Sequence, residues 1–456
     1  MRSEFDGGWE SWGRYPKVAH EGCLVPEALA DVPSLLDSVR GHPVLPRGAG
    51  RSYGDACLNE GGYLLSTRQL NRIVFFDEEV GAIRCEAGVS LGEILSLCVP
   101  RGWFLPVTPG TMHVTVGGAI ANDVHGKNHH WAGCFGNHST RFLLWRTDGG
   151  LTACSRGSNP DLFRATLGGL GLTGVILWAE LKLKPIGSPN LAVESIRFDD
   201  LDQFFALSQE SIENYEYSVA WIDCLAGGRG LCRGLFLRGN HQPKDLASTR
   251  PSARRLPWTV PENLPPGLLS PWTARLLNSL HYHRQWRTCR CFSSHYEPFF
   301  YPLDRVNHWN RLYGRRGFLQ WQCVVPPKEG EEVIRSILKE VARSRLAPFL
   351  GVLKEFGDTP ALGMLSFPMP GVTLALDFAN LGDELLSALE RLDRMVLECG
   401  GRINPAKDSR MSAATFRASF PGLDEFTHHV DPGLSSSLFR RIGGLAAAPL
   451  ELQLSN

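Results

Sequence analysis

The chain has 456 residues, enough for two or three domains, and its 43% hydrophobic and 21% charged residues are typical of a globular protein with a sizeable core. Lys plus Arg and Asp plus Glu both number 47. The resulting net charge of zero argues against nucleic acid as the main partner, because phosphate binding normally leaves a basic surplus. The N-terminal segment lacks the apolar core of a signal peptide, and no run reaches the roughly 18 apolar residues of a spanning helix. We therefore expect at most peripheral contact with a membrane.

Twelve cysteines are scattered along the chain, and only Cys289 and Cys291 lie close together in the sequence. No CxxC pair is present, so the pattern predicts neither a zinc site nor a disulfide framework. We interpret these residues as reduced thiols of a cytoplasmic protein.

Hydrophobic periodicity predicts elements of both types along the chain. In chain order they are a strand at residues 81–89, a helix at 90–97, a helix-like segment at 161–166, a strand at 175–183, a strand at 318–325, a helix at 331–341, a strand at 371–378, and a helix that Asp383 caps and that stops at Gly400. Strands and helices in mixed order predict an α+β fold.

Two of these segments carry finer expectations. The strand at 175–183 alternates, so one face should hold Val175, Leu177, Ala179, Leu181 and Leu183. Residues 238–272 are rich in proline and lack periodicity, which is typical of a substrate lid, a mobile loop or a surface insertion.

The first glycine-rich loop is PRGAGRSYGD at residues 46–55. Small residues at Gly48, Ala49, Gly50 and Ser52 let successive backbone N–H groups surround an anion, which predicts a phosphate site. A plain tight turn is the alternative interpretation of this loop alone.

The second loop, residues 109–130, combines a VGGAIA run with His125, Lys127, His129 and His130. No carboxylate or cysteine completes a metal-ligand spacing, so we predict no metal site and favour a polar active-site floor. Residues 169–174 match GxGxxG, but a helix precedes them and a strand follows. A Rossmann fingerprint requires the reverse order, so we reject a nicotinamide-binding domain.

These loops, with AGV at residues 87–89, resemble in their order the FAD-binding domain of the vanillyl-alcohol-oxidase superfamily. Further motifs make nearly the whole chain similar to the decaprenylphosphoryl-β-D-ribose 2′-oxidase family, the flavin half of an epimerase pair that makes an arabinose donor. These motifs are HGKNHH, FGNHSTR, GGLGLTGVI, YSVAWID, YPLD, WNRLYG, GFLQWQ and AKDSR.

The resemblance implies a two-lobed, PCMH-type FAD-binding domain that is discontinuous in the sequence, at residues 1–186 and 402–456. An α+β substrate domain with an antiparallel sheet would occupy residues 187–401. It also implies noncovalent FAD, because some superfamily relatives attach the flavin through a histidine in the first loop, and here that loop has none.

The resemblance further implies the site residues. Lys407 and His125 would be catalytic, and the substrate would meet Lys127, Trp221, Gln320, Gln322 and Lys354. The cofactor would contact Pro46, Arg47, Gly48, Ala49, Gly50, Arg51, Ser52, Tyr53, Gly54, Asp55, Ala56, Gly110, Thr115, Val116, Gly117, Gly118, Asn122, Asp123, Val124, His125, Ile176 and Asn404.

Two roles are open for Lys407: a base whose pKa is lowered by burial, or a cation that stabilises negative charge. A surface lysine paired with Asp408 is the plain alternative. His125 would orient the substrate hydroxyl, act as the base, or only pack under the flavin. Arg410 is a further candidate for binding a phosphate group.

The function implied is FAD-dependent oxidation of a secondary sugar hydroxyl to a ketone by hydride transfer to flavin N5. The expected substrate is a polyprenylphosphoryl-β-D-ribose used for cell-envelope synthesis, oxidised at its 2′-hydroxyl. A separate NAD(P)H-dependent reductase would be the partner, and the protein would lie at the inner face of the plasma membrane. The alternatives are a soluble aldonolactone or polyol oxidase on the same scaffold, and a flavin-binding assembly protein. Thr373, Ala375 and Asn404 depart from the family pattern near the pocket.

Overall fold

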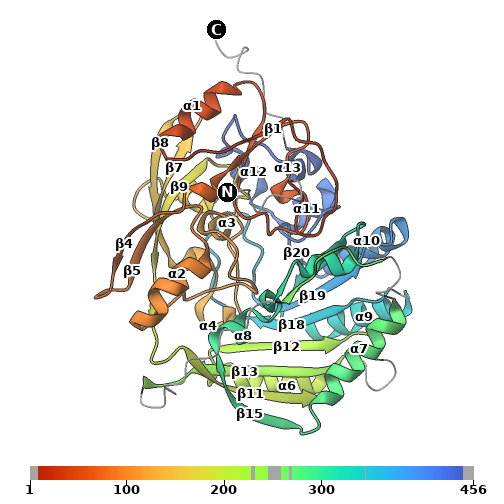
Figure 1. Cartoon of the computed structure of the whole chain (residues 1–456). Coiled ribbons are helices and arrows are strands. Elements are labelled where there is room, and N and C mark those ends of the chain that lie inside the picture. The colour runs from red at the N-terminus through yellow and green to blue at the C-terminus, as the bar shows by residue number, and fades with distance from the viewer. Residues whose placement is uncertain (1–8, 227–231, 245–257, 266–269, 345, 445–456) are drawn as a thin grey trace.

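The computed structural model describes residues 9–226, 232–244, 258–265, 270–344 and 346–444 (Figure 1). The molecule is α+β, as predicted from the sequence. One body combines the chain up to β10 (Lys184–Pro185) with the C-terminal segment, and the other is built around a large antiparallel sheet.

The first body contains two sheets. A three-stranded parallel sheet has the order β1-β3-β2, and a five-stranded antiparallel sheet has the order β4-β5-β9-β7-β8. Its strands are β1 (Gly22–Leu24), β2 (Val44–Arg47), β3 (Tyr63–Ser66), β4 (Ile73–Asp77), β5 (Ala82–Glu86), β7 (Ser139–Arg146), β8 (Gly150–Ser155) and β9 (Val175–Lys182), with β6 (Trp103–Phe104) paired to β10 (Lys184–Pro185). Its helices are α1 (Asp31–Ser38), α2 (Leu91–Cys98), α3 (Val116–Ala121), α4 (His129–Ala132), α5 (Pro160–Thr166), α11 (Ala413–Ser419), α12 (Leu423–Thr427) and α13 (Ser437–Arg441).

The second body is an eight-stranded sheet of order β15-β11-β13-β12-β18-β19-β17-β20. Its strands are β11 (Asn190–Phe198), β12 (Tyr217–Asp223), β13 (Arg233–His241), β15 (Cys289–His295), β17 (Phe318–Val325), β18 (Leu350–Phe356), β19 (Gly371–Ala379) and β20 (Arg402–Ile403), with the small pair β14 (Trp258–Thr259) and β16 (Val306–Asn307) beside it. Its helices are α6 (Leu201–Ser211), α7 (Pro271–Arg284), α8 (Tyr296–Phe300), α9 (Gly330–Arg343) and α10 (Asp383–Glu398).

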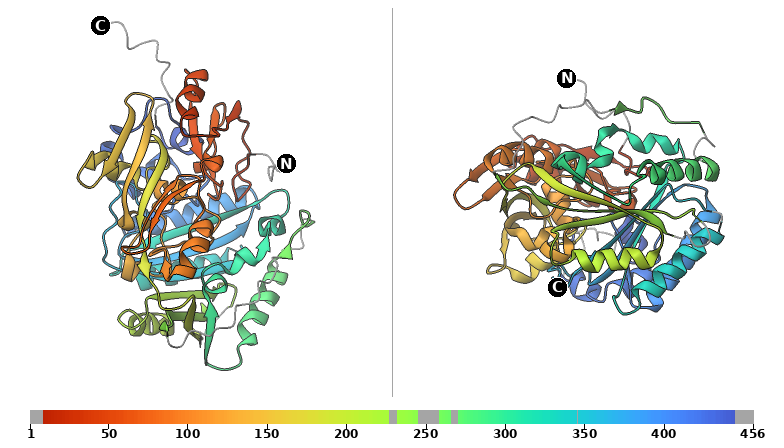
Figure 2. Two further views of the ribbon diagram at one scale, coloured as in Figure 1. Left: turned by 60° about the vertical axis from the view of Figure 1, so that its left-hand side comes forward. Right: turned by 90° about the horizontal axis from the view of Figure 1, so that it is seen from below.

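The two faces of this sheet have different partners. Seen from below in Figure 2, α6, α9 and α10 lie on one side and α7 on the other. Strand β12 shows why: Ala220 and Ile222 belong to the core under α6 and α9, whereas Val219 and Trp221 line a cavity on the opposite face. Period-two alternation therefore divides the sheet into a packing face and a binding face.

The C-terminal segment returns to the first body after one short strand. Residues Arg402 and Ile403 form β20 and pair with β17, and later residues contact β2 through Leu434, which bridges Val44. The predicted division into residues 1–186, 187–401 and 402–456 stays a prediction, and the structure adds that β20 belongs to the larger sheet.

Most predicted elements are present, with three differences. Gly382, and not Asp383, is the N-cap of α10, whose first turn contains Asp383. Strand β9 does not keep one apolar face: Val175 and Leu177 join a different core cluster from Ala179 and Leu181, because the pairing with β7 shifts register opposite Leu177.

The third difference concerns residues 238–272. About half of the predicted lid or insertion lies outside the described residues, at 245–257 and 266–269. Strand β13 continues to His241, and helix α7, which periodicity did not predict, begins at Pro271 behind a Ser270–Thr273 capping box. Among the described helices, none has the length and apolarity of a membrane span.

A buried ion pair links the C-terminal segment to α10. Asp393 accepts hydrogen bonds from Arg410 at 2.7 and 2.9 Å and from the Trp321 indole at 2.8 Å, and all three side chains are buried. Replacing one member leaves a buried charge without its partner, which costs about 3–5 kcal/mol. Arg410 is therefore a structural residue, and it does not line the cavity.

We predict that Asp393→Ala lowers the free energy of unfolding by about 3–5 kcal/mol in urea denaturation, since Arg410 would stay buried and unpaired. The matched control is Glu340→Ala, which removes the more exposed 3.1 Å pair with Arg391 of the same helix and should cost no more than about 1 kcal/mol. Equal losses in the two variants would contradict this assignment.

Candidate active site

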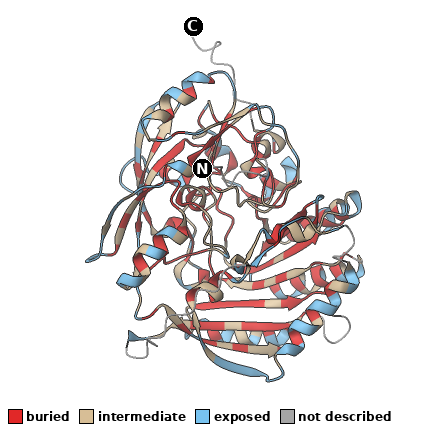
Figure 3. Cartoon of the chain, in the orientation of Figure 1, coloured by how far each residue is buried: buried red, intermediate tan, exposed pale blue. Residues whose placement is uncertain are grey.

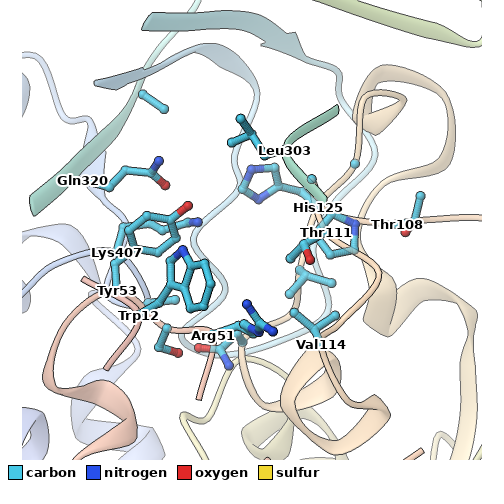
Figure 4. A pocket seen from close by; sticks show the side chains of 18 of the residues that line it. Trp12, Arg51, Tyr53, Thr108, Thr111, Val114, His125, Leu303, Gln320 and Lys407 are labelled. Atoms are coloured by element: carbon cyan, nitrogen blue, oxygen red, sulfur yellow. The ribbon is translucent and has the colours of Figure 1, made fainter. Parts of the chain in front are cut away.

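A cavity of about 870 Å³ lies where the two bodies meet, and both contribute to its wall. From the first body come the two glycine-rich loops, and from the second come the binding faces of β12, β17, β18 and β19. Figure 4 shows side chains from both bodies pointing toward the same space, among them Tyr53, His125, Gln320 and Lys407.

Backbone N–H groups of the first loop form one end of the cavity. The loop leaves β2 and turns at Gly50, whose φ of +62° is in the left-handed region that favours glycine. A Cβ on Gly48 would collide with the Thr115 side chain. In the described chain, the N–H groups of Ala49, Gly50, Arg51 and Ser52 donate to no protein acceptor. Four successive free donors in a concave turn are a site for phosphate oxygens.

The second loop contributes space rather than donors. The N–H groups at the start of α3 already donate, Val116 to Val89 O at 2.8 Å and Gly117 to Ala87 O at 2.8 Å. A Cβ added to Gly110, by contrast, would meet nothing within 4 Å. The loop thus leaves room for a ligand that lies flat against its backbone.

Buried polar atoms without partners also face this region. Asn122 Oδ1 and Arg47 Nε are buried, have no hydrogen-bond partner among the described residues, and belong to side chains that line the cavity. Buried polar atoms are normally hydrogen-bonded, so these two atoms can bond to a polar ligand in the cavity. Together with the free N–H groups, they fit a dinucleotide that carries a pyrophosphate.

Lys407 lies at the junction of the two bodies. Its Nζ is 3.9 Å from the centroid of the Tyr53 ring. Burial lowers the pKa of Lys407 to about 7, while Asp377 acts in the opposite direction and Lys354 adds to the decrease. Burial likewise raises the pKa of Asp377 to about 6, against the effects of Gln320 and Lys407. A surface lysine paired with Asp408 is thereby excluded.

A chain of hydrogen bonds connects Lys407's segment to His125. Asn404 donates from Nδ2 to Gln322 Oε1 at 2.9 Å, so Gln322 presents its NH₂ group to Thr373 at 3.1 Å and to His125 Nε2 at 3.2 Å. Burial, with Lys354, His129 and Lys407 nearby, holds the pKa of His125 well below its usual value. His125 is therefore neutral, and its Nε2 accepts the bond from Gln322.

Two more lysines project into the same cavity. Lys127 donates from Nζ to Phe300 O at 2.9 Å, and Lys354 donates to Gly126 O at 3.3 Å. Burial and the neighbouring Lys354 lower the pKa of Lys127 to about 7, and burial lowers that of Lys354 to about 8. Since each ammonium has three donors, both keep capacity for an anionic ligand, whose charge would raise these pKa values again.

The structure brings most of the predicted residues to the cavity. Both predicted catalytic residues and all five predicted substrate residues line it, as do most of the predicted cofactor residues. Four do not: Gly54 packs against Asp408 O, Asp55 pairs with Arg441, Val116 is a core residue, and Asp123 accepts from Gly136 N and Ser366 Oγ. These four residues stabilise the loops through contacts on the side away from the cavity.

Of the four basic residues at positions 125–130, only His125 and Lys127 line the cavity. His129 packs against Phe356, and His130 bonds to Tyr215 O at 3.0 Å. Across the described residues, no group of three or more His, Cys, Asp or Glu side chains is arranged to hold a metal ion.

Sequence reasoning missed several residues of the site. Trp12 stacks on the Arg51 guanidinium at 4.1 Å, and Asp304 holds the second loop by accepting from Met112 N at 2.9 Å. Asp377, the neighbour of Lys407, could have been found from the sequence. It is a carboxylate in a largely apolar strand, two residues after Ala375 and four after Thr373. An acidic residue at such a position needs a polar partner.

Comparison with known proteins agrees with this geometry. A family model described as "FAD binding domain" matches residues 21–155. The chain is 38% identical to decaprenylphosphoryl-beta-D-ribose oxidase of Mycolicibacterium smegmatis, over 94% of this chain and 96% of that protein. It is 36% identical to an uncharacterized protein in the mprA 5′ region of Streptomyces coelicolor, over 78% of this chain and all of that protein. L-gulonolactone oxidase of Mus musculus is 28% identical over 39% of this chain and 40% of that enzyme.

We predict that Gly110→Val weakens FAD binding by at least about tenfold, because the new side chain enters space that the wall leaves to the ligand. The dissociation constant is measured by quenching of flavin fluorescence on titration with apoprotein. Gly157→Val is the matched control, since a Cβ there also meets nothing within 4 Å and Gly157 does not line the cavity. Unchanged affinity in the Gly110 variant would place the cofactor elsewhere.

Proposed function

The chain belongs to the family of decaprenylphosphoryl-β-D-ribose oxidase, and on that premise we propose that it oxidises the 2′-hydroxyl of a polyprenylphosphoryl-β-D-ribose to a ketone. It is an FAD-dependent oxidoreductase. The observation that carries the proposal is the set of three half-buried lysines, Lys127, Lys354 and Lys407, in one cavity with the amide side chains of Gln320 and Gln322 beside them. A neutral sugar alone does not need three cations.

Lys127 and Lys354 bind the phosphodiester in this proposal. Both side chains are half-buried, and a cation largely removed from water is stable only when an anion or several acceptors replace the water. Among the described residues each ammonium has one hydrogen-bond acceptor, Phe300 O for Lys127 and Gly126 O for Lys354. The substrate phosphate supplies the missing charge and leaves the pentose directed toward Lys407.

Gln320, Gln322 and Trp221 hold the pentose. The two glutamines are two residues apart on β17 and therefore face the cavity together. There the Gln320 amide and the remaining lone pair of Gln322 Oε1 can bond to hydroxyl groups. Trp221 packs edge-on against His281 of α7 at 4.5 Å between ring centroids, which fixes its ring as part of the wall.

Lys407 takes the hydroxyl proton. Bound FAD supplies the hydride acceptor of the reaction, at flavin N5. The base must be uncharged before the reaction, and a pKa near neutrality matches that task better than the strongly lowered pKa of His125. His125, held by Gln322 at 3.2 Å, orients the substrate hydroxyl instead. After proton transfer, the Lys407 ammonium faces the Asp377 carboxylate.

FAD binds without a covalent link in this proposal, since the first loop has no histidine to attach it. The cofactor lies along Pro46–Tyr53, Gly110, Thr115, Gly117–Gly118, Asn122, Val124, Ile176 and Asn404. A separate NAD(P)H-dependent reductase consumes the ketone as the partner enzyme, and the protein works as a peripheral protein at the inner face of the plasma membrane in cell-envelope synthesis.

The substrate test is anaerobic bleaching of the flavin. We predict that a short-chain prenylphosphoryl ribose bleaches the 450 nm band, whereas D-arabinono-1,4-lactone and free ribitol do not. Lys407→Met should keep FAD bound and reduce the bleaching rate by about 10²–10⁴-fold, the usual contribution of a general base. Turnover of the lactone or polyol without turnover of the prenylphosphoryl ribose would contradict the proposal.

We also predict a bell-shaped pH dependence of kcat/KM. The rate rises with pH through about 7, because the fraction of uncharged Lys407 increases there. It falls as pH rises through about 7 to 8, because first Lys127 and then Lys354 lose the charge that binds phosphate. Stopped-flow reduction over pH 5–10 measures both limbs. The double variant Lys127→Arg, Lys354→Arg should move the alkaline limb upward, since arginine stays charged, and an unmoved limb would contradict the assignment.

A further inference from the structure

Helix α7 differs from an ordinary surface helix, because its large apolar side chains face outward and polar side chains are buried beneath it. It buries Ala274, Asn278 and Tyr282, and the last two are anchored by polar bonds, Asn278 to Asp223 at 3.2 Å and Tyr282 to Asp199. Its large apolar side chains point away from the protein. A surface helix normally buries its apolar stripe against the core. The outward apolar stripe of α7 therefore does not contribute to the packing of this chain.

The outer face of α7 consists of Trp272, Leu276 and Leu280, at a spacing of four residues that places them side by side. Their exposed fractions are 78%, 60% and 59%. Leu277, beside them, is 54% exposed, and Trp286, just beyond the helix, is 74% exposed. Figure 3 shows the exposed outer side of α7 at the edge of the second body. Exposed apolar side chains gathered in this way mark a binding surface.

The charged residues in and directly after α7 all have one sign. Between Glu262 and Glu297 the sequence contains no Asp or Glu, but it contains four arginines. Arg275, Arg284, Arg287 and Arg290 are exposed, and none forms an ion pair with a described acidic side chain. Tryptophan and leucine bordered by arginine are the composition of helices that lie in a bilayer interface with anionic lipids.

The inner side of the same helix is part of the cavity wall. Leu277, Asn278 and His281 line the cavity, and His281 packs against Trp221. Leu277, which is exposed and also lines the cavity, thus joins the apolar outer face to the cavity wall.

From these observations we propose that the outer face of α7 docks on the surface of an anionic lipid bilayer, with the cavity opening toward the membrane. Trp272, Leu276 and Leu280 enter the interface, and the arginines bind lipid phosphates. A second copy of the chain is a poorer occupant, because it would oppose two arginine-rich faces without acidic partners. Delivery of a polyprenyl lipid along α7 rests on the proposed function; docking itself does not.

The test is co-sedimentation of the FAD-loaded protein with vesicles of phosphatidylcholine containing 30% phosphatidylglycerol. We predict binding that weakens with added salt, because screening reduces the attraction between arginines and lipid phosphates. The triple variant Trp272→Ser, Leu276→Ser, Leu280→Ser should lose at least about tenfold in apparent affinity. The matched control is Val80→Ser, Leu151→Ser, Leu381→Ser, whose side chains are 59%, 61% and 52% exposed elsewhere, and it should bind as wild type does.

A second variant, Arg284→Gln with Arg287→Gln, keeps the apolar side chains and should weaken binding to the anionic vesicles but not to pure phosphatidylcholine. Flavin absorbance and the melting temperature confirm folding of each variant. Failure of the wild type to bind vesicles, or equal binding by the α7 triple variant, would overturn the proposal. So would an α7-dependent dimer in light scattering without vesicle binding.

Oxidation of prenylphosphoryl ribose in detergent is measured with the same proteins. Oxidation without vesicle binding would contradict the docking proposal and would still support the proposed function. Vesicle binding that depends on α7, without oxidation, would support docking and remove the proposed function.

Discussion

Residues 404–408 bond to both bodies of the molecule, and the arrangement of the cavity depends on those bonds. On one side, Tyr53 N donates to Ala406 O at 2.9 Å, and a side chain at Gly54 would collide with Asp408 O. On the other side, Asn404 donates from its backbone N to Gln322 O at 2.9 Å and from Nδ2 to Gln322 Oε1 at 2.9 Å. The segment thus fixes the first loop against β17. Because Lys407 lies between these contacts, its ammonium is buried over Tyr53 at the place where the two bodies meet.

This arrangement places positive charge in a cavity that shields it from water. Lys127, Lys354 and Lys407 are all held with lowered pKa values, because burial removes the water that stabilises an ammonium group. A cavity of this kind favours an anionic ligand, which restores the lost stabilisation, and it places one lysine near neutrality, where it can exchange a proton. Binding and proton transfer therefore follow from one physical cause. In the proposals made above, the outward apolar face of α7 lies where the lipid part of such a ligand would be.

Local patterns predicted the loops and most strands, because small residues and period-two alternation act over a few positions. The rest depends on partners distant in the sequence. Asp377 becomes the neighbour of Lys407 only through the pairing of β17 with β19 and the return of the C-terminal segment. The bulge at Leu177 divides the predicted apolar face of β9 between two clusters, and it is seen only in the pairing of β9 with β7. Helix α7 was missed because its apolar stripe faces outward, and Gly54 and Val116 were assigned to the cofactor because a motif does not tell which of its residues face a ligand.

The central claim is that burial at this junction brings Lys407 close to neutrality. Carbon-13 NMR of the protein labelled at lysine Cε measures this directly, with Lys407→Arg used to assign the resonance. The account predicts that the Lys407 signal titrates near pH 7 in the FAD-loaded protein, more than three pH values below the roughly 10.4 of a free lysine. A resonance that titrates above pH 10 would show an ordinary ammonium group and would contradict the account.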